Sequence, residues 1–303
     1  MDGIFNLYKP LGLLSHQVVA AVRRASGEKR VGHAGTLDPG AEGVLLVCVG
    51  PATRVTEYLM RGTKVYCAEI CLGTSTDTYD GEGRVTRCAS VEGIGRVEVE
   101  AALATLVGHI EQRPPAYSAI KQQGVPLYRL ARQGLPVEPP RREVEVHEAH
   151  LLAWLSPLLR VEFRCSPGTY VRSLAHALGQ RLGCGAHLSH LVRLASGRFT
   201  IREAIDLTTF LEAIEQGYWP EFAYSIDEAL LGMDVVLLGA EQEHLFRNGG
   251  DWVATRNNDC SPTHHVANTS ALGVKARCYS LDGEMLGIAE LRDGRWWPHK
   301  VLV

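Results

Sequence analysis

The stretch VGHAGTLDPGAEGVLLVCVG, residues 31–50, places a glycine-rich segment directly before an apolar run. Asp38 stands among these glycines in an Asp-Pro step, next to what the apolar run predicts to be a buried strand. A functional loop carried by a rigid element has this form. An ordinary turn has it as well, because Asp-Pro steps are common in turns. The rest of the chain must decide between the two.

The composition is that of an ordinary globular protein, with 303 residues of which 46% are hydrophobic and 21% are charged. The first residues, MDGIFNLYKPLG, lack a basic segment followed by an apolar one, so no signal peptide is predicted. The longest apolar runs, such as 44–49, are too short to cross a bilayer. The eight cysteines are scattered, which is typical of reduced thiols. We therefore expect a cytoplasmic protein.

The charges are unevenly distributed along the chain, although the net charge is only −3. Residues 1–202 carry 24 Lys and Arg against 18 Asp and Glu, a balance of +6. Residues 203–303 carry 7 against 16, a balance of −9. The first two thirds could therefore bind a polyanion, although a chance distribution of surface charge fits the same numbers.

Hydrophobic periodicity predicts helices and strands in an irregular order. The predicted helices cover 15–24, opened by Ser15 as N-cap, and 97–107, 125–134, 171–182 and 208–216, and the predicted strands cover 63–72, 142–150 and 158–165. Because no regular alternation of strand and helix is present, the pattern favours an α+β fold over a doubly wound sheet.

The sequence also predicts two domains. A break falls near 231–233, and beyond it short strand-like segments alternate with turn signals at 235–238, 274–280, 286–291 and 296–303. Between them, 254–271 is polar and without a period, as expected of a mobile loop. We therefore divide the chain into residues 1–232 and a small β-rich domain, residues 233–303.

A second stretch gives Asp38 a possible partner. In SPGTYVRSL, residues 166–174, Arg172 stands near the start of a predicted helix that follows a strand. A loop carboxylate and a loop arginine at such junctions could meet as a bidentate pair. The pair would keep Asp38 ionised and oriented as a nucleophile. A turn aspartate and a surface arginine remain the simpler alternatives.

Other residues point to RNA more than to a metal or a nucleotide cofactor. Tyr66 follows two basic residues, Arg61 and Lys64, and an aromatic ring beside cations suits stacking on a base, although ordinary strand packing fits equally well. The glycines lack the Lys-Ser/Thr ending of a phosphate-binding loop and the spacing of a dinucleotide motif. Cys260, His264 and His265 match no standard zinc spacing, so we predict no metal site.

Together these stretches resemble the TruB family of tRNA pseudouridine-55 synthases. The matching stretches are GIFNLYKPLGLLSHQVV (3–19), GHAGTLDPGAEGVLLVCVGPATR (32–54), KVYCAEICLGTSTDTYDGEG (64–83), RPPAYSAIKQQGVPLYRLAR (113–132), SPGTYVRSLA (166–175) and GAHLSHLVRLASGRF (185–199). The elements GTLDP and RPPxYSAxK are the most specific of them. The resemblance covers nearly all of 1–232, and LGIAEL (286–291) resembles the small PUA-like RNA-binding domain of the family.

The resemblance implies a pseudouridine-synthase fold, with a mixed, largely antiparallel central sheet flanked by helices and a PUA-like C-terminal domain. It implies that the chain isomerises uridine 55 in the T-loop of tRNA on a flipped-out base, as a monomer without cofactor, metal or protein partner. The residues implied are the catalytic Asp38, Arg172 as its partner, Tyr66 stacked on the base, His33 supporting the opened T-loop, and Lys64, Lys121 and Arg132 as phosphate contacts.

Some positions depart from the family pattern, and other functions stay open. Gly40 and Glu42 replace an aliphatic residue and a threonine, Tyr79 fills a usually small position, and Glu42 adds a negative charge near the RNA. The alternatives are a tRNA-folding or RNA-binding protein with a dead or weak site, and a synthase for a different RNA. Retention of Asp38, Tyr66 and Arg172 argues against a dead site. Attack of Asp38 on C1′ or on C6 fits the sequence equally well.

Overall fold

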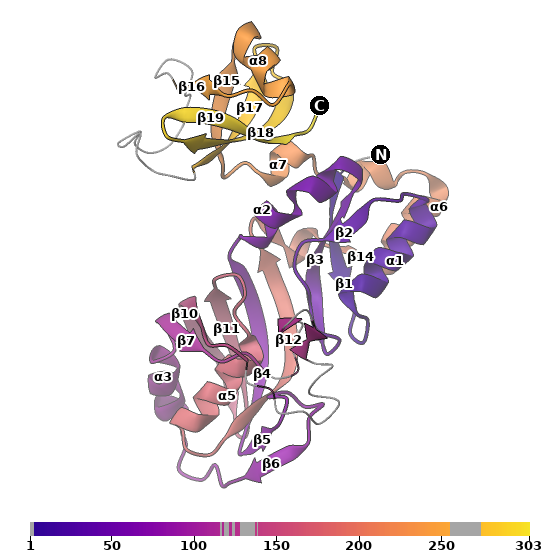
Figure 1. Ribbon diagram of the computed structural model, residues 1–303. Coiled ribbons are helices and arrows are strands. Elements are labelled where there is room, and N and C mark those ends of the chain that lie inside the picture. The colour runs from indigo at the N-terminus through magenta and orange to yellow at the C-terminus, as the bar shows by residue number, and fades with distance from the viewer. Residues whose placement is uncertain are drawn as a thin grey trace.

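The computed structural model describes residues 3–115, 117, 121, 122, 125–127, 137, 139–254 and 274–303. The described chain forms an elongated molecule in which a large sheet occupies the body and a smaller sheet lies at one end (Figure 1). The main path of the large sheet runs through β14 (Ile205–Asp206), β1 (Gly3–Lys9), β3 (Ala41–Val49), β12 (Ala186–Ser196), β4 (Lys64–Leu72), β11 (Leu158–Cys165), β10 (Arg142–Leu155) and β7 (Gly108–Gln112). β2 (Val31–His33) pairs with β3, and β13 (Phe199–Thr200) pairs with β12.

The large sheet is mixed but mostly antiparallel, because only the β1–β14 and β3–β12 pairs run parallel. β4 shows strict alternation of buried and half-buried residues, so one of its faces is fully covered. β3 is buried along nearly its whole length, as expected of a central strand covered on both faces. The fold is thus the α+β fold that the irregular order of elements predicted.

Helices cover the large sheet and fix the ends of its strands. The helices of this part are α1 (Ser15–Ser26), α2 (Thr56–Met60), α3 (Arg96–Ala104), α5 (Val171–Arg181), α6 (Leu207–Gln216) and α7 (Ile226–Ala229), with 3₁₀ turns η1 (Gly50–Val55), η2 (Ile201–Glu203) and η3 (Trp219–Phe222). α1 buries Val18, Val19 and Val22, whose spacing follows one helical face. α5 packs against β12 and β4, which places its N-terminus beside the centre of the sheet.

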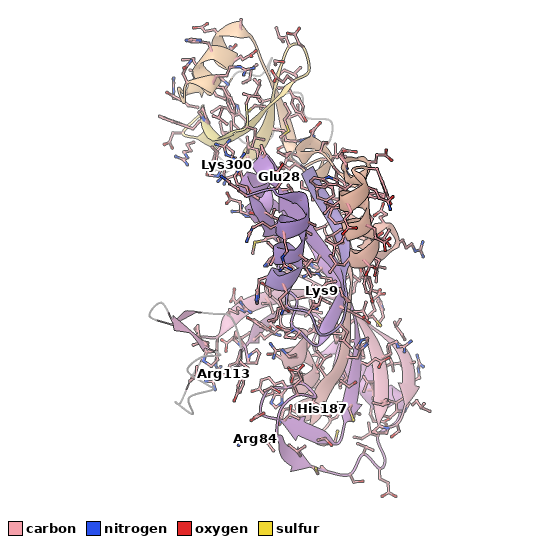
Figure 2. The ribbon with its side chains drawn as sticks, turned by 90° about the vertical axis from the view of Figure 1, so that its right-hand side faces the viewer. Lys9, Glu28, Arg84, Arg113, His187 and Lys300 are labelled. Atoms are coloured by element: carbon pink, nitrogen blue, oxygen red, sulfur yellow. The ribbon has the colours of Figure 1, made fainter. Side chains whose placement is uncertain are left out.

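A small sheet closes the C-terminal end of the molecule. Its order is β15 (Asp234–Leu238), β17 (Lys275–Ser280), β18 (Met285–Arg292), β19 (Arg295–Val301) and β16 (Trp252–Val253), and α8 (Ala240–Arg247) packs against it. Ile288 of this sheet is fully buried in one cluster with Ile4 and Leu46 of the large sheet. Lys300 lies at the junction (Figure 2), where its Nζ is 3.0 Å from Glu57 Oε1. The two sheets therefore share part of a hydrophobic core.

Several local predictions need correction. Ser15 is the first residue of α1 rather than its N-cap, which is Leu14. In the predicted helix 125–134, the first two residues form β9 (Val125–Pro126), which pairs with β8 (Lys121–Gln122), Leu127 is helical as predicted, and residues 128–134 lie outside the described part of the chain. α8 was missed because its eight residues lie between strand signals. A two-stranded hairpin, β5 (Thr74–Thr76) and β6 (Val85–Cys88), was missed as well. The predicted loop 254–271 falls outside the described residues from 255 onward.

Candidate active site

The Asp38 loop, residues 34–40, connects β2 to β3 and is held through its main chain. The hydroxyl of Ser15 accepts a hydrogen bond from the Leu37 amide at 2.9 Å and donates one to the Leu37 carbonyl at 3.0 Å. The amide of Ala41 donates to the Asp38 carbonyl at 3.1 Å. Since the Asp38 side chain is 45% exposed, the loop presents a carboxylate that a substrate can reach.

Arg172, in the first turn of α5, connects Asp38 to a second carboxylate. Its side chain is 8% exposed, and its Nη2 lies 2.9 Å from Asp38 Oδ2. Its Nη1 donates to Asp80 Oδ2 at 2.9 Å, and Nη2 donates to the Tyr117 carbonyl at 3.2 Å. The two residues meet, but the bidentate geometry predicted for them is wrong, because the guanidinium divides its nitrogens between two carboxylates.

Asp80 was missed by the sequence reasoning and is rigidly placed. Its Oδ1 accepts hydrogen bonds from the Thr78 hydroxyl at 2.5 Å and from the Glu82 amide at 3.1 Å. The preceding residue, Tyr79, has a φ of 66°, which is rare for a residue with a side chain. The Tyr79 ring stacks on His176 with a centroid distance of 4.0 Å. The only available signal was the acidic turn TSTDTYDGEG, which alone gives no hint of a partner.

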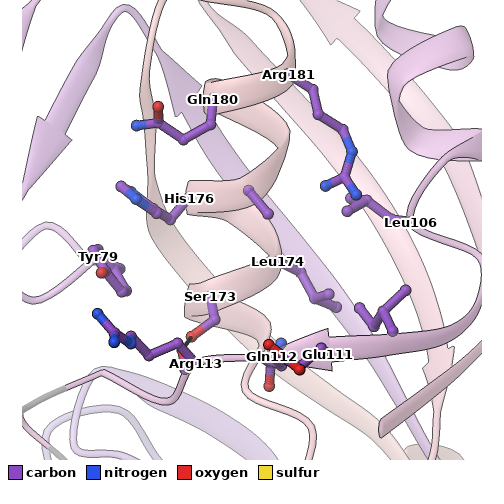
Figure 3. A pocket seen from close by; sticks show the side chains of 12 residues that line it. Tyr79, Leu106, Glu111, Gln112, Arg113, Ser173, Leu174, His176, Gln180 and Arg181 are labelled. Carbon is purple, nitrogen blue, oxygen red and sulfur yellow. Dashed lines mark hydrogen bonds between the residues drawn. The ribbon is translucent and has the colours of Figure 1, made fainter. Parts of the chain in front are cut away.

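A groove of about 500 Å³ opens beside this turn along α5. Tyr79 and His176 lie close together on one side of the helix, and Ser173 and Arg113 lie near its N-terminal end (Figure 3). The hydroxyl of Ser173 donates to the Arg113 carbonyl at 2.9 Å. The groove and the Asp38–Arg172–Asp80 network therefore share the N-terminal part of α5 and the turn at Tyr79.

Tyr66 lies on β4 with 9% of its surface exposed, and β12 places Arg193 opposite it in the sheet. Burial raises the pKa of the Tyr66 hydroxyl, and the neighbouring Arg193 partly opposes this shift. The Tyr66 phenol therefore stays protonated at neutral pH.

The His33 imidazole and the Lys9 ammonium group lie near the Asp38 loop, where burial lowers the pKa of each. Burial lowers the pKa of the His33 imidazole, and the positive charge of Arg193 lowers it further, so the ring is neutral at pH 7. Lys9 lies near the centre of the molecule (Figure 2), where its Nζ donates to the Leu13 carbonyl at 2.6 Å and the Pro10 carbonyl at 3.0 Å. Burial lowers the pKa of Lys9 to about 8, although Asp38 opposes the shift.

The phosphate contact predicted for Lys64 is contradicted by the structure. Its side chain is buried, and its Nζ donates to the Leu59 carbonyl at 3.2 Å. Lys64 is the first residue of β4, and alternation along that strand turns its side chain toward the covered face. Of the other two residues predicted to contact phosphate, Lys121 is described in its backbone only and Arg132 lies outside the described residues.

A pH titration of stability tests the burial of Lys64. Burial lowers its pKa to about 8, below its unfolded value, so unfolding takes up a proton between about pH 8 and 10.5. The free energy of unfolding of the wild type, relative to Lys64→Met, should therefore rise by about 2–3 kcal/mol as the pH rises through this window. Urea unfolding of both proteins at several pH values measures the difference. Parallel curves would show that Lys64 is solvated.

Glu42, one of the unusual residues, is paired rather than free. Its Oε1 lies 3.1 Å from His190 Nε2, and its carboxylate also acts on the Tyr8 hydroxyl. Burial and Glu42 together raise the pKa of Tyr8 to about 12. The extra carboxylate thus lies beside neighbours on β1 and β12.

Two features are missing from the described residues, a metal-binding cluster and a membrane-spanning helix. No group of three or more His, Cys, Asp or Glu side chains is placed to hold a metal ion there. No helix in that part of the chain is long and apolar enough to cross a membrane.

Comparison with known proteins identifies the family. A family model described as "TruB family pseudouridylate synthase (N terminal domain)" matches residues 23–171, and one for the "tRNA pseudouridylate synthase B C-terminal domain" matches residues 172–238. The tRNA pseudouridine synthase B of Dehalococcoides mccartyi is 40% identical over 304 aligned residues, covering 100% of this chain and 97% of the relative. That of Geobacter sulfurreducens is 44% identical over 297 residues, covering 98% and 95%.

Solved structures share the fold. A chain in the crystal structure of a Cbf5–Nop10–Gar1 complex superposes with a TM-score of 0.76 at 24% identity, covering 99% of this chain and 85% of that one. At this identity the likeness establishes the fold alone, whereas the sequence matches above extend over both chains almost completely. This chain belongs to the TruB family of pseudouridylate synthases.

Proposed function

We propose that this protein isomerises uridine to pseudouridine at position 55 in the T-loop of tRNA, without a cofactor. The observation that carries the proposal is the Asp38 carboxylate, which is 45% exposed while its partner Arg172 is almost fully buried. An exposed carboxylate held by a fixed buried cation is suited to act as a nucleophile. Membership of the family, with relatives named tRNA pseudouridine synthase B, supports tRNA as the substrate.

The reaction breaks the glycosidic bond from C1′ to N1 and forms a bond from C1′ to C5. The base gains a proton at N1 and loses one from C5, so atoms and electrons balance without an oxidant or reductant. We assign the attack on the nucleotide, at C1′ or at C6, to Asp38. The detached base must turn without leaving, which a closed site around Asp38 and Tyr66 would ensure.

The other residues would act on the flipped nucleotide and its loop. Because the atoms attacked are unreachable inside a folded RNA, the uridine must first leave its stack. Tyr66, protonated and nearly buried, would stack on the flipped base. His33, kept neutral by burial, would fill the place the base has left. Lys121 and Arg132 remain proposed phosphate contacts.

We further propose that residues 1–232 form the catalytic domain and residues 233–303 a PUA-like RNA-binding accessory domain. The separate small sheet supports this division. The hydrophobic cluster that Ile288 shares with Ile4 and Leu46 supports a fixed arrangement of the two parts. We propose a cytoplasmic monomer that needs no protein partner, since the chain itself carries the segments proposed to face the T-loop.

Mapping of pseudouridine in tRNA tests the proposal. A strain lacking this protein should have uridine at position 55, and the purified protein should convert it to pseudouridine in vitro. Modification at another position would make it a synthase for a different RNA site. Binding of tRNA without any pseudouridine in a single-turnover assay would instead make it an RNA-binding or RNA-folding protein.

A further inference from the structure

Arg193 is the largest fully buried side chain described in the protein, with 1% of its surface exposed. Its guanidinium donates through Nε to the Val44 carbonyl at 2.6 Å. It also donates through Nη2 to the Gly35 carbonyl at 3.1 Å and through Nη1 to the Thr36 carbonyl at 3.4 Å. Within the described part of the chain, no carboxylate forms an ion pair with it. A buried cation is therefore stabilised mainly by main-chain oxygens.

The groups that Arg193 binds belong to the elements that carry the site. Gly35 and Thr36 lie in the Asp38 loop, and Val44 lies on β3, which follows that loop. Arg193 is also the β12 residue aligned with Tyr66 on β4, and its charge acts on the Tyr66 hydroxyl. One rigid, planar group thus contacts the loop and the strand after it, from a residue that is paired with Tyr66 in the sheet.

The main chain of Arg193 is fixed as firmly as its side chain. β12 lies between β3 and β4, and Arg193 is aligned with Gly43 on one side and with Tyr66 on the other. Gly43 has a φ of 102°, and a Cβ placed there would approach the Arg193 carbonyl oxygen to 2.3 Å. Only glycine allows this close approach. The main chain of Arg193 is therefore held in place by both neighbouring strands, which limits the positions that its guanidinium can take.

We propose that Arg193 is a positioning residue, which fixes the Asp38 loop relative to Tyr66 and thereby sets the rate of isomerisation rather than the affinity for RNA. The proposal rests on the function proposed above. The contact between Asp38 and Arg172 is made by the two side chains. It places the carboxylate correctly if the main chain of the Asp38 loop is itself held in position. The three carbonyl contacts of Arg193, together with Ser15 on Leu37, supply that placement.

Two substitutions in the full-length protein separate positioning from charge. Arg193→Lys keeps the charge, but one ammonium group cannot reach the Val44, Thr36 and Gly35 carbonyls together. Arg193→Met removes both charge and donors. Arg277 offers a matched control, because it is also buried and donates to Asp227, to the Tyr279 hydroxyl and to the Met233 carbonyl, but in the small sheet.

The first measurement is the single-turnover rate and the dissociation constant on an isolated T-stem-loop, below the melting temperature of each variant. Arg193→Met should lower the rate by about 100-fold or more and Arg193→Lys by about 10-fold or more, with RNA affinity within about three-fold, because small displacements of reacting groups cost this much. Arg277→Lys and Arg277→Met should keep rates on the stem-loop within about three-fold of wild type, since Arg277 donates to Asp227, Tyr279 and Met233 rather than to the Asp38 loop.

The second measurement does not depend on activity. Hydrogen exchange followed by mass spectrometry should show faster exchange of amides 34–41 in Arg193→Lys, and no change there in Arg277→Lys. If the wild type makes no pseudouridine, the proposed function fails while this measurement still decides the role of Arg193. Unchanged exchange, unchanged rates, or a loss of rate explained by RNA affinity would overturn the proposal. So would failure of both Arg193 variants to fold, which would make the residue structural.

Discussion

Asp38→Asn is expected to abolish pseudouridine formation and to leave the affinity for tRNA within a few-fold. Asparagine has nearly the shape of aspartate, and the loop is held through the main-chain contacts of Leu37 and Ala41, which the substitution does not touch. The amide, however, is a poor nucleophile. Loss of a covalent catalyst lowers a rate by many factors of ten, whereas one lost contact lowers it by about one or two.

The measurement is the single-turnover rate on tRNA, together with the dissociation constant from filter binding. Asp251→Asn is a suitable control, because Asp251 also pairs with an arginine, Arg295, but in the small sheet. The control should retain the wild-type rate. An Asp38→Asn variant that kept a tenth of the wild-type rate would show that the carboxylate is not the nucleophile.

The strands and the meeting of Asp38 with Arg172 could be predicted from the sequence for physical reasons. Apolar and polar residues alternate in 63–72 and 158–165, because one face of each strand is buried. The predicted bounds of both strands therefore agree with β4 and β11 to within one residue. Asp38 and Arg172 both stand at junctions of loops with regular elements, and such junctions collect at the ends of strands.

The contacts that the sequence did not reveal depend on strand order. Asp80 contacts Arg172, as Asp38 does, only because the turn after β5 reaches the N-terminus of α5. Arg193 lies under the Asp38 loop only because β12 inserts between β3 and β4, which are distant from it along the chain. A sequence pattern identifies the face of a strand but not its neighbours. The same limit explains the error at Lys64. A basic residue close to an aromatic one in the sequence suggested an exposed RNA-binding surface, but the Lys64 side chain is buried.

Arg172→Lys is expected to lower the single-turnover rate by about 100-fold or more, with tRNA affinity changed much less, because the catalytic carboxylate loses its fixed position. The guanidinium of Arg172 contacts Asp38, Asp80 and the Tyr117 carbonyl at the same time. A single ammonium group on a flexible chain cannot satisfy all three, and the half-buried carboxylate of Asp80 competes with Asp38 for it.

That competition can be tested through Asp80. In Arg172→Lys the ammonium should favour Asp80, whose side chain is 20% exposed, over Asp38, which is 45% exposed, since a charge pair is stronger where water is scarcer. Adding Asp80→Asn to Arg172→Lys should therefore return the lysine to Asp38 and recover part of the rate, whereas Asp80→Asn alone should slow the enzyme. A double variant no faster than Arg172→Lys would contradict the competition. A nearly normal rate in Arg172→Lys would show that positive charge suffices without the planar fork.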